Sequence, residues 1–220
     1  MNFKNAIFDM DGTLIDSLIF WDILWSKLGK KYLNNEGFHP FAEDDKAVRT
    51  LTLKDGMALI HKKYGIAESA DSLLEETNNA IVEFYTETVE LKSGVKEFLD
   101  YCYNQGTKMC IASATATEFI KIALKRCGIE KYFSGVFSCA DIGIGKEKPD
   151  IFLIAKEHLG SNISETWIFD DSLVAVKTAK VAGFNVVGIY DRFNFGQDEI
   201  EKSADIYINN NETLLKFKDL

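Results

Sequence analysis

The sequence contains no long hydrophobic run. No segment of its 220 residues approaches the ~18 apolar residues that a membrane-spanning helix needs. The first residues also show no basic region leading into an apolar stretch, so we expect no signal peptide. These absences argue against a membrane protein, and we expect a cytoplasmic location.

Cysteine is scarce, and its spacing excludes the common metal and redox motifs. Cys102, Cys110, Cys127 and Cys139 show no C-x-x-C pattern and lie within apolar segments. We therefore expect free, buried thiols in a reducing compartment rather than disulfides or a zinc site.

Positive charge is in deficit. The 25 Lys and Arg residues are outnumbered by 34 Asp and Glu residues, which gives a net charge of −9. Nucleic acids and anionic membranes bind through a basic face, so neither is an expected partner. A small phosphorylated metabolite remains compatible, because a pocket can be locally positive on an acidic protein. We infer no protein partner.

Short apolar segments that alternate with longer helical patterns make up much of the chain. Strands without polar alternation, separated by helices, indicate an α/β fold with a parallel sheet that is covered on both faces. The expected strands are Ala6–Phe8, Lys108–Ala112, Gly135–Ser138, Thr166–Phe169, Val186–Tyr190 and Asp205–Ile208. The expected helices between the later strands lie near Lys92–Gln105, Thr117–Cys127, Asp150–Leu159 and Leu173–Ala182. Thr115 and Glu118 have the spacing of a capping box at the start of the second of these helices.

One region contains only helical signals. Leu18, Trp21, Leu24, Trp25 and Leu28 recur at helical spacing, and further helical patterns follow to about residue 86. We predict an inserted helical domain over residues 16–91, and an α/β core formed by residues 1–15 and 92–220. The expected connections are Leu14–Asp16 and Leu91–Gly94.

Two pairs of carboxylates follow predicted strands. Asp9 and Asp11 leave the first strand two positions apart, before Gly12, and Asp170 and Asp171 follow the strand at Thr166–Phe169. Charge at the mouth of a buried strand is costly unless it is used. Because ligands bind at the carboxyl ends of parallel strands, we expect both pairs at one site.

Two weaker signals lie at similar positions. Ser113, Ala114 and Thr115 follow the second predicted strand, where a hydroxyl group and free backbone amides would form a phosphate cradle. Ser and Thr at such junctions are also common simple caps. Lys146 and Lys148 precede the helix that begins near Pro149, and either could be an ordinary solvated lysine.

These four segments are more specific together than alone. Asp9, Asp11, Asp170 and Asp171 offer hard oxygen ligands suited to Mg²⁺. Ser113 and one lysine supply donors to an anion. The combination predicts a metal ion and a phosphoryl group at one site.

The whole chain resembles the haloacid dehalogenase-like (HAD) hydrolase superfamily. The stretches "DGTLIDS" and "PDIF" are usual wording in the subgroup that contains phosphoglycolate phosphatase-like and β-phosphoglucomutase-like enzymes. That subgroup has a Rossmann-like core and a helical cap between its first and second motifs, where the predicted helical domain lies. The resemblance therefore implies the HAD fold and a helical cap.

The resemblance also implies roles for individual residues. Asp9 would be the nucleophile, and Asp11 the general acid and base, with its backbone carbonyl or carboxylate also at the metal. Asp171 aligns with the direct magnesium ligand and Asp170 with the carboxylate beside it. Ser113 would bind the phosphoryl group. Counting back from "PDIF" assigns the lysine to Lys146, although Lys148 lies close enough to compete.

The implied function is Mg²⁺-dependent hydrolysis of a small, sugar phosphate-like phosphomonoester through an aspartyl-phosphate. A β-phosphoglucomutase-type phosphosugar mutase is one alternative, and a non-enzymatic phospho-aspartate regulatory protein is another. Phe20, Trp21 and the segment Arg49–Lys54 are candidates for substrate contact, although a tryptophan at position 21 is more often part of the cap interior than a substrate contact. The sequence does not identify the substrate.

Overall fold

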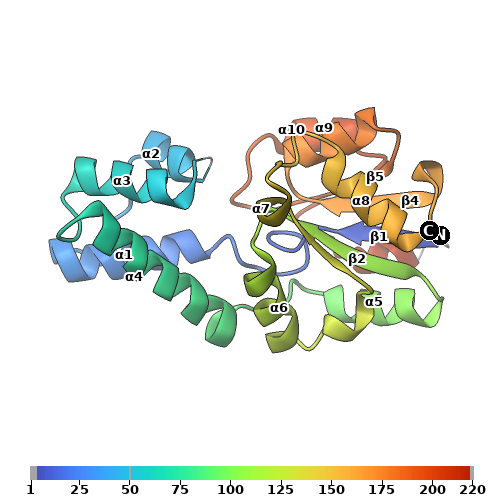
Figure 1. The fold of residues 1–220 in the computed structure, drawn as a ribbon, viewed down its shortest axis with the longest axis horizontal. Helices are drawn as coiled ribbons and strands as arrows, with labels where there is room; N and C mark the ends of the chain where they lie inside the picture. Colours follow the sequence, from blue (N-terminus) through green and yellow to red (C-terminus); the bar gives the residue numbers. More distant parts are fainter. Residues whose placement is uncertain (1–3, 50, 219–220) are drawn as a thin grey trace. The chain divides into compact units, whose positions relative to one another are not determined.

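Six parallel strands form the sheet of the computed structural model, which describes residues 4–49 and 51–218 (Figure 1). Their order across the sheet is β3-β2-β1-β4-β5-β6. The strands are β1 (Asn5–Phe8), β2 (Lys108–Ser113), β3 (Val136–Ser138), β4 (Thr166–Asp170), β5 (Asn185–Ile189) and β6 (Ile206–Ile208). The predicted α/β fold with a parallel sheet is confirmed. All four cysteines are free thiols, as expected, and Cys102, Cys110 and Cys139 are buried. Cys127 is only partly buried, so the expectation of burial is wrong for this residue.

Helices cover both faces of this sheet. They are α5 (Val95–Asn104), α6 (Thr117–Arg126), α7 (Cys139–Ile142), α8 (Asp150–Leu159), α9 (Leu173–Val181) and α10 (Gln197–Ser203), with short 3₁₀ turns η2 (Glu130–Tyr132), η3 (Ile163–Glu165) and η4 (Leu214–Lys218). On one face, Ile7 and Ile168 pack against Phe152 of α8 and Ala179 of α9. Small residues on α9 permit this close packing against the sheet.

An aromatic cluster fills the opposite face. Because successive side chains of a strand point to opposite faces, Phe8 and Phe169 lie on the other side from Ile7 and Ile168. The rings of Phe8 and Phe169 stack with centroids 4.5 Å apart. Phe98 of α5 and Phe217 of η4 pack against Phe169 at 5.7 and 5.5 Å. All four side chains are completely buried.

The chain divides into two compact units. One consists of Met1–Leu18 and Val89–Leu220 and contains the sheet, and the other is Ile19–Thr88. The second unit is helical: α1 (Phe20–Leu33), α2 (Ala42–Val48), α3 (Leu53–Tyr64), α4 (Ala70–Glu83) and the π-helix η1 (Phe84–Thr88). Trp25 is buried in its interior and donates a hydrogen bond to Asp45 at 2.8 Å. Within the predicted segment Arg49–Lys54, Thr50 lies outside the described residues.

The two connecting segments pair with each other. Ile15 and Leu91 form an antiparallel bridge. Lys92 donates its backbone N–H to Leu14 at 2.9 Å, and Asp16 donates to Glu90 at 3.0 Å. The chain therefore leaves and re-enters the α/β core, hereafter the first unit, through adjacent segments.

One local expectation is wrong. Thr115 and Glu118 do not form a capping box, because α6 begins at Thr117 and its N-cap residue, Ala116, makes no side-chain cap. The Thr115 hydroxyl instead donates to Asp11 at 2.7 Å. The helix expected to begin near Pro149 is α8, which Pro149 immediately precedes, and Ser172 caps the start of α9 by accepting the Ala175 backbone N–H.

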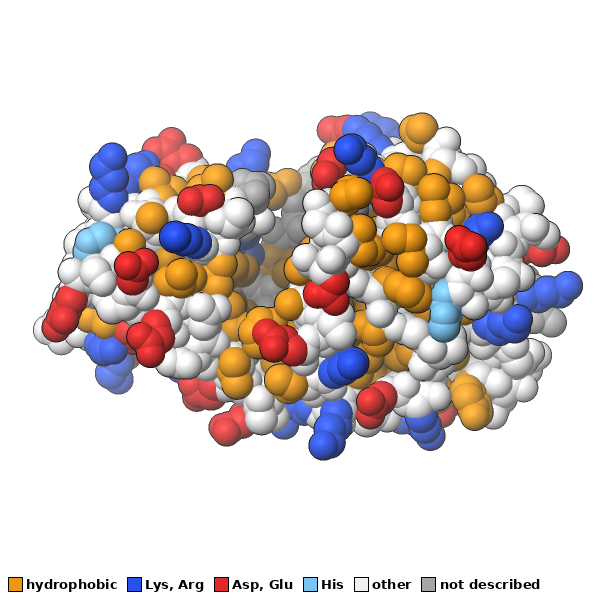
Figure 2. Space-filling view, in the orientation of Figure 1, with side chains coloured by type: hydrophobic (Ala, Val, Ile, Leu, Met, Phe, Trp, Pro, Cys, Tyr) orange, Lys and Arg blue, Asp and Glu red, His pale blue; other side chains and the backbone are white. Residues whose placement is uncertain are grey.

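The described surface carries both signs of charge. On the face that Figure 2 shows, Lys and Arg side chains alternate with Asp and Glu side chains. Across residues 4–49 and 51–218, none of the helices combines the length and the apolar character that a membrane crossing requires.

Replacing Phe169 by alanine should strongly destabilise the first unit. Phe169→Ala leaves a cavity between Phe8, Phe98 and Phe217, so we expect the free energy of unfolding to fall by about 3–5 kcal/mol. Urea unfolding monitored by circular dichroism measures this change. The control Val181→Ala alters a side chain that is 90% exposed and should change stability by less than about 0.5 kcal/mol. Equal effects of the two changes would contradict the packing described.

Candidate active site

The predicted site residues gather at the carboxyl ends of neighbouring strands. Asp9 directly follows β1, Ser113 ends β2 and Asp170 ends β4. Strand β1 lies between β2 and β4 (Figure 1). The chain adds β2 and β3 on one side of β1, and β4, β5 and β6 on the other side. This is where open parallel sheets bind their ligands.

Three carboxylates form the centre of the site. Asp9, Asp170 and Asp171 each place an oxygen within 4.8 Å of the others, and all three residues are buried. Burial disfavours the charged carboxylate and raises the pKa of Asp9 to about 6, against the opposing attraction of Lys146. Burial, followed by the neighbouring charges of Asp9 and Asp170, also raises the pKa of Asp171 well above its ordinary value.

One lysine compensates part of this negative charge. Lys146 lies in the loop between α7 and α8, and its Nζ donates to Asp9 Oδ1 at 2.6 Å and to Asp170 Oδ2 at 2.7 Å. Its side chain is only 9% exposed. Burial opposes the charged form, but the attraction of Asp170 and Asp9 outweighs it and raises the lysine pKa. Lys148, the competing candidate, is exposed and is not part of this cluster.

Asp11 has different neighbours from the other three aspartates. Its carboxylate accepts from Ser17 Oγ and from Thr115 Oγ1, each at 2.7 Å. Ser113 is buried, and its Oγ accepts the Thr115 backbone N–H at 3.2 Å.

Two further predicted substrate residues, Ala114 and Trp21, have different surroundings. Ala114 is exposed in the loop after β2. Trp21 belongs to the helical unit, where its ring stacks on Trp25 with centroids 5.6 Å apart.

Several residues that contact Asp171 were not assigned roles from the sequence. Thr13 Oγ1 donates to Asp171 Oδ1 at 2.9 Å, and the Asn194 side-chain amide donates to Oδ2. Gly12, with φ = 76°, lies so close that a Cβ atom there would be 2.1 Å from Asp171 Oδ2. The glycine of the first motif therefore allows the backbone to approach this carboxylate.

The donor set fits a hard divalent cation. Three buried carboxylates lie together, and Lys146 bonds to two of them, Asp9 and Asp170, so the site has excess negative charge and is rich in oxygen ligands. Mg²⁺ prefers carboxylates together with water and phosphate oxygens. The coordinating atoms would come from Asp9, Asp171 and Asp170.

Comparison with known proteins identifies the family. The model of the haloacid dehalogenase-like hydrolases matches residues 6–189. The chain belongs to this family. The predicted family membership and the prediction of a hydrolase are both confirmed.

The hydrolase is similar over nearly its whole length to several curated relatives. It is 24% identical to a phosphorylated carbohydrates phosphatase of Thermotoga maritima over 217 residues, 98% of each chain. It is 25% identical to a phosphoglycolate phosphatase of Nitrosococcus oceani over 222 residues, 97% of this chain and 94% of the relative.

Solved structures share the fold of the hydrolase. A Thermotoga maritima protein with the provisional name β-phosphoglucomutase gives a TM-score of 0.82 at 24% identity and covers 99% of both chains. CbbY of Rhodobacter sphaeroides, crystallised with phosphate, gives 0.74 at 17% identity and covers 94% of this chain and 93% of its own.

The two lysines should differ sharply in their effect on stability. Lys146→Met leaves Asp9 and Asp170 buried without their partner, so we expect a loss of about 3–5 kcal/mol in the free energy of unfolding. Lys148→Met changes an exposed side chain and should cost less than about 0.5 kcal/mol. Urea unfolding of both variants in EDTA makes the comparison, and a similar cost for both would show that Lys146 does not compensate the carboxylates.

Proposed function

We propose that this hydrolase is a Mg²⁺-dependent phosphatase that cleaves a small, sugar phosphate-like phosphomonoester through an aspartyl-phosphate on Asp9. The observation that carries the proposal is the buried cluster of Asp9, Asp170 and Asp171, in which the Lys146 ammonium group bonds to Asp9 and Asp170. Phosphatases of phosphorylated carbohydrates and of phosphoglycolate among the relatives support the same reaction class.

The metal would be held by Asp9, Asp171 and Asp170, together with the Asp11 backbone carbonyl. When bound, Mg²⁺ supplies the positive charge that lets an anionic phosphate approach an anionic carboxylate and that stabilises charge on the phosphoryl oxygens.

Side chains of the protein carry out the nucleophilic attack, the proton transfers and the binding of the phosphoryl group. An Asp9 carboxylate oxygen forms a bond to phosphorus as the bond from phosphorus to the leaving alcohol oxygen breaks. Asp11 gives the leaving oxygen a proton, and later takes a proton from the water that attacks the phosphorus of the aspartyl-phosphate. This second step releases inorganic phosphate and restores the Asp9 carboxylate. Lys146 and the Ser113 hydroxyl donate to phosphoryl oxygens, where charge spreads in the transition state.

Contacts around Asp11 suit a group that exchanges protons. The hydroxyls of Ser17 and Thr115 orient its two oxygens from opposite ends of the carboxylate. Either hydroxyl can rotate when Asp11 becomes protonated, because a hydroxyl both donates and accepts. Asp11 can therefore gain or lose a proton while it keeps its hydrogen bonds to Ser17 and Thr115 and its orientation.

The helical unit would act as the cap of this enzyme. In that role it excludes water and selects the leaving group, and Trp21 and the segment Arg49–Lys54 are its candidate substrate contacts. We propose a small phosphorylated metabolite as the only partner, with turnover in the cytoplasm.

A phosphosugar mutase is the second candidate, because a solved structure with this fold carries the provisional name β-phosphoglucomutase. The segment Leu18–Trp25, which follows the first motif, is mostly apolar and has no cation to hold a second phosphate. Hydrolysis is therefore preferred. Assaying glucose 1-phosphate for both phosphate release and glucose 6-phosphate formation separates the two activities.

Substituting the nucleophile should abolish turnover. Asp9→Asn removes the attacking carboxylate, so we expect Mg²⁺-dependent phosphate release from p-nitrophenyl phosphate to fall at least about a thousandfold. The matched control Asp198→Asn alters an exposed aspartate of α10 and should retain wild-type activity. An Asp9→Asn variant with wild-type activity would exclude the aspartyl-phosphate mechanism.

Magnesium should stabilise the folded protein. A ligand at about a hundredfold excess over its dissociation constant adds ~2.7 kcal/mol, which corresponds to a rise of about 5–10 °C in Tm for a chain of this size. Differential scanning calorimetry with Mg²⁺ and with EDTA measures the rise. Asp171→Asn removes a proposed ligand and should lose most of the effect, whereas Asp198→Asn should keep it. A wild-type Tm that is the same in Mg²⁺ and in EDTA would refute the metal site.

A further inference from the structure

The loop between β5 and α10 holds the carboxylate of Asp171 in place. The Asn194 side-chain amide donates both to Asp171 Oδ2 and, at 3.1 Å, to the Asp171 backbone carbonyl. Thr13 Oγ1 occupies the other carboxylate oxygen. Because the Asn194 amide bonds to both the backbone carbonyl and the carboxylate of Asp171, it restricts the rotation of the Asp171 side chain. Each carboxylate oxygen still has a lone pair for a metal, because a carboxylate offers about four acceptor positions.

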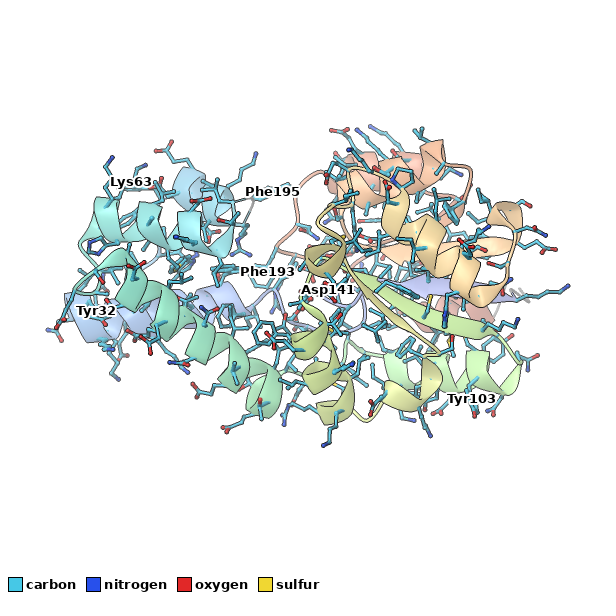
Figure 3. The ribbon with its side chains drawn as sticks, in the orientation of Figure 1. Tyr32, Lys63, Tyr103, Asp141, Phe193 and Phe195 are labelled. Carbon is cyan, nitrogen blue, oxygen red and sulfur yellow. The ribbon has the colours of Figure 1, made fainter. Side chains whose placement is uncertain are left out.

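Asn194 is itself held by a network within its loop. Its backbone N–H donates to the Asp191 carbonyl at 3.1 Å, and the Gln197 side-chain amide donates to the carbonyls of Asp191 and Asn194 at 2.9 and 3.2 Å. Tyr207 of β6 in turn donates to Gln197 Oε1 at 2.8 Å. Phe193 and Phe195, labelled in Figure 3, flank Asn194 on this loop, and Phe195 is 59% exposed. The polar contacts of Asn194 and Gln197 therefore help to fix the loop.

A partly buried ion pair connects this network to the first motif. Lys92 Nζ donates to Asp191 Oδ2 at 2.9 Å, to the Gly12 carbonyl at 2.6 Å and to the Tyr190 carbonyl at 2.9 Å. These contacts use all three donors of the ammonium group. Asp191 is 3% exposed, and its other oxygen accepts the Phe193 backbone N–H at 2.9 Å. Lys92 thus joins the loop that carries Asn194 to the loop that carries Asp9 and Thr13.

We propose that Asn194 is a positioning residue that orients Asp171 for a divalent cation, and that the Lys92–Asp191 ion pair anchors Asn194 for this role. The inference rests on the proposed function, because it takes Asp171 as a ligand of the catalytic metal. Groups that orient metal ligands typically contribute 10–100-fold to metal affinity or activity. Neither Asn194 nor Lys92 touches the reacting atoms in this scheme.

The test is the Mg²⁺ affinity of the full-length chain. Asn194→Ala and the near-isosteric Asn194→Leu both remove the amide donor, and we expect each to raise the Mg²⁺ dissociation constant by about 10–100-fold in isothermal titration calorimetry. The Mg²⁺ concentration for half-maximal phosphate release should rise by the same factor, while kcat at saturating Mg²⁺ changes only a few-fold. The control Asn210→Ala alters an exposed asparagine after β6 and should leave both quantities unchanged.

Several outcomes would overturn the inference. Wild-type Mg²⁺ affinity in both Asn194 variants overturns it while leaving the proposed function intact. A fall in Tm in EDTA without a change in Mg²⁺ affinity shows a purely structural role and overturns it as well. A wild-type protein that neither binds Mg²⁺ nor releases phosphate from p-nitrophenyl phosphate overturns the proposed function, and the positioning role with it.

A second variant tests the anchor. Lys92→Met releases the loop from the Gly12 carbonyl and from Asp191, so we expect weaker Mg²⁺ binding in the same direction as for Asn194→Ala. If Lys92 acts through Asn194, the double variant Lys92→Met/Asn194→Ala should have a Mg²⁺ dissociation constant no higher than that of the single variant with the higher constant. Fully multiplicative losses would show that Lys92 acts independently of Asn194 and would overturn its role as the anchor.

Discussion

Three buried carboxylates lie close together in the α/β core, and the Lys146 ammonium group bonds to two of them, Asp9 and Asp170. The polar structure around the site is arranged to satisfy the remaining negative charge. An isolated charge costs several kcal/mol to bury, so each carboxylate needs donors or a cation nearby. Lys146 bridges Asp9 and Asp170, and the Ser172 backbone N–H donates to Asp170 at 2.9 Å. Asp171 depends on neutral donors from two other loops. The site therefore requires loops that follow β1, β3, β4 and β5 at once, and a parallel sheet brings these loops to one edge.

The sheet and the central residues could be predicted because their signals are local. A strand buried on both faces, such as Thr166–Asp170, is an apolar run whose end is marked by the first carboxylate. The family resemblance then aligned Lys146 rather than Lys148, and the structure places the Lys146 ammonium group between two carboxylates while Lys148 is exposed. The position of Asp170 could also be predicted from the local sequence, because this carboxylate ends the apolar run that forms β4.

The surroundings of these residues could not be predicted, because their contacts span long stretches of the chain. Lys92 and Asp191 are 99 positions apart, and nothing in the local sequence around either residue indicates that they pair. Thr115 shows how a local pattern can mislead. Its spacing to Glu118 is that of a capping box, but its hydroxyl bonds to Asp11, 104 positions away, and the helix begins without that cap. Asn194, in an irregular loop, gave no signal that a single sequence could reveal.

The position of β1 in the sheet has a consequence for how the polypeptide is made. This strand leaves the ribosome first, yet its two neighbours in the sheet are β2 at residues 108–113 and β4 at residues 166–170. The contiguous unit Ile19–Thr88 is synthesised before either neighbour exists. Because domains fold as units during synthesis, the helical unit can mature while the buried surface of β1 still waits for partners. Until β4 has been synthesised, β1 thus lacks one of its two neighbouring strands, and exposed apolar strands of this kind favour aggregation and are protected by chaperones.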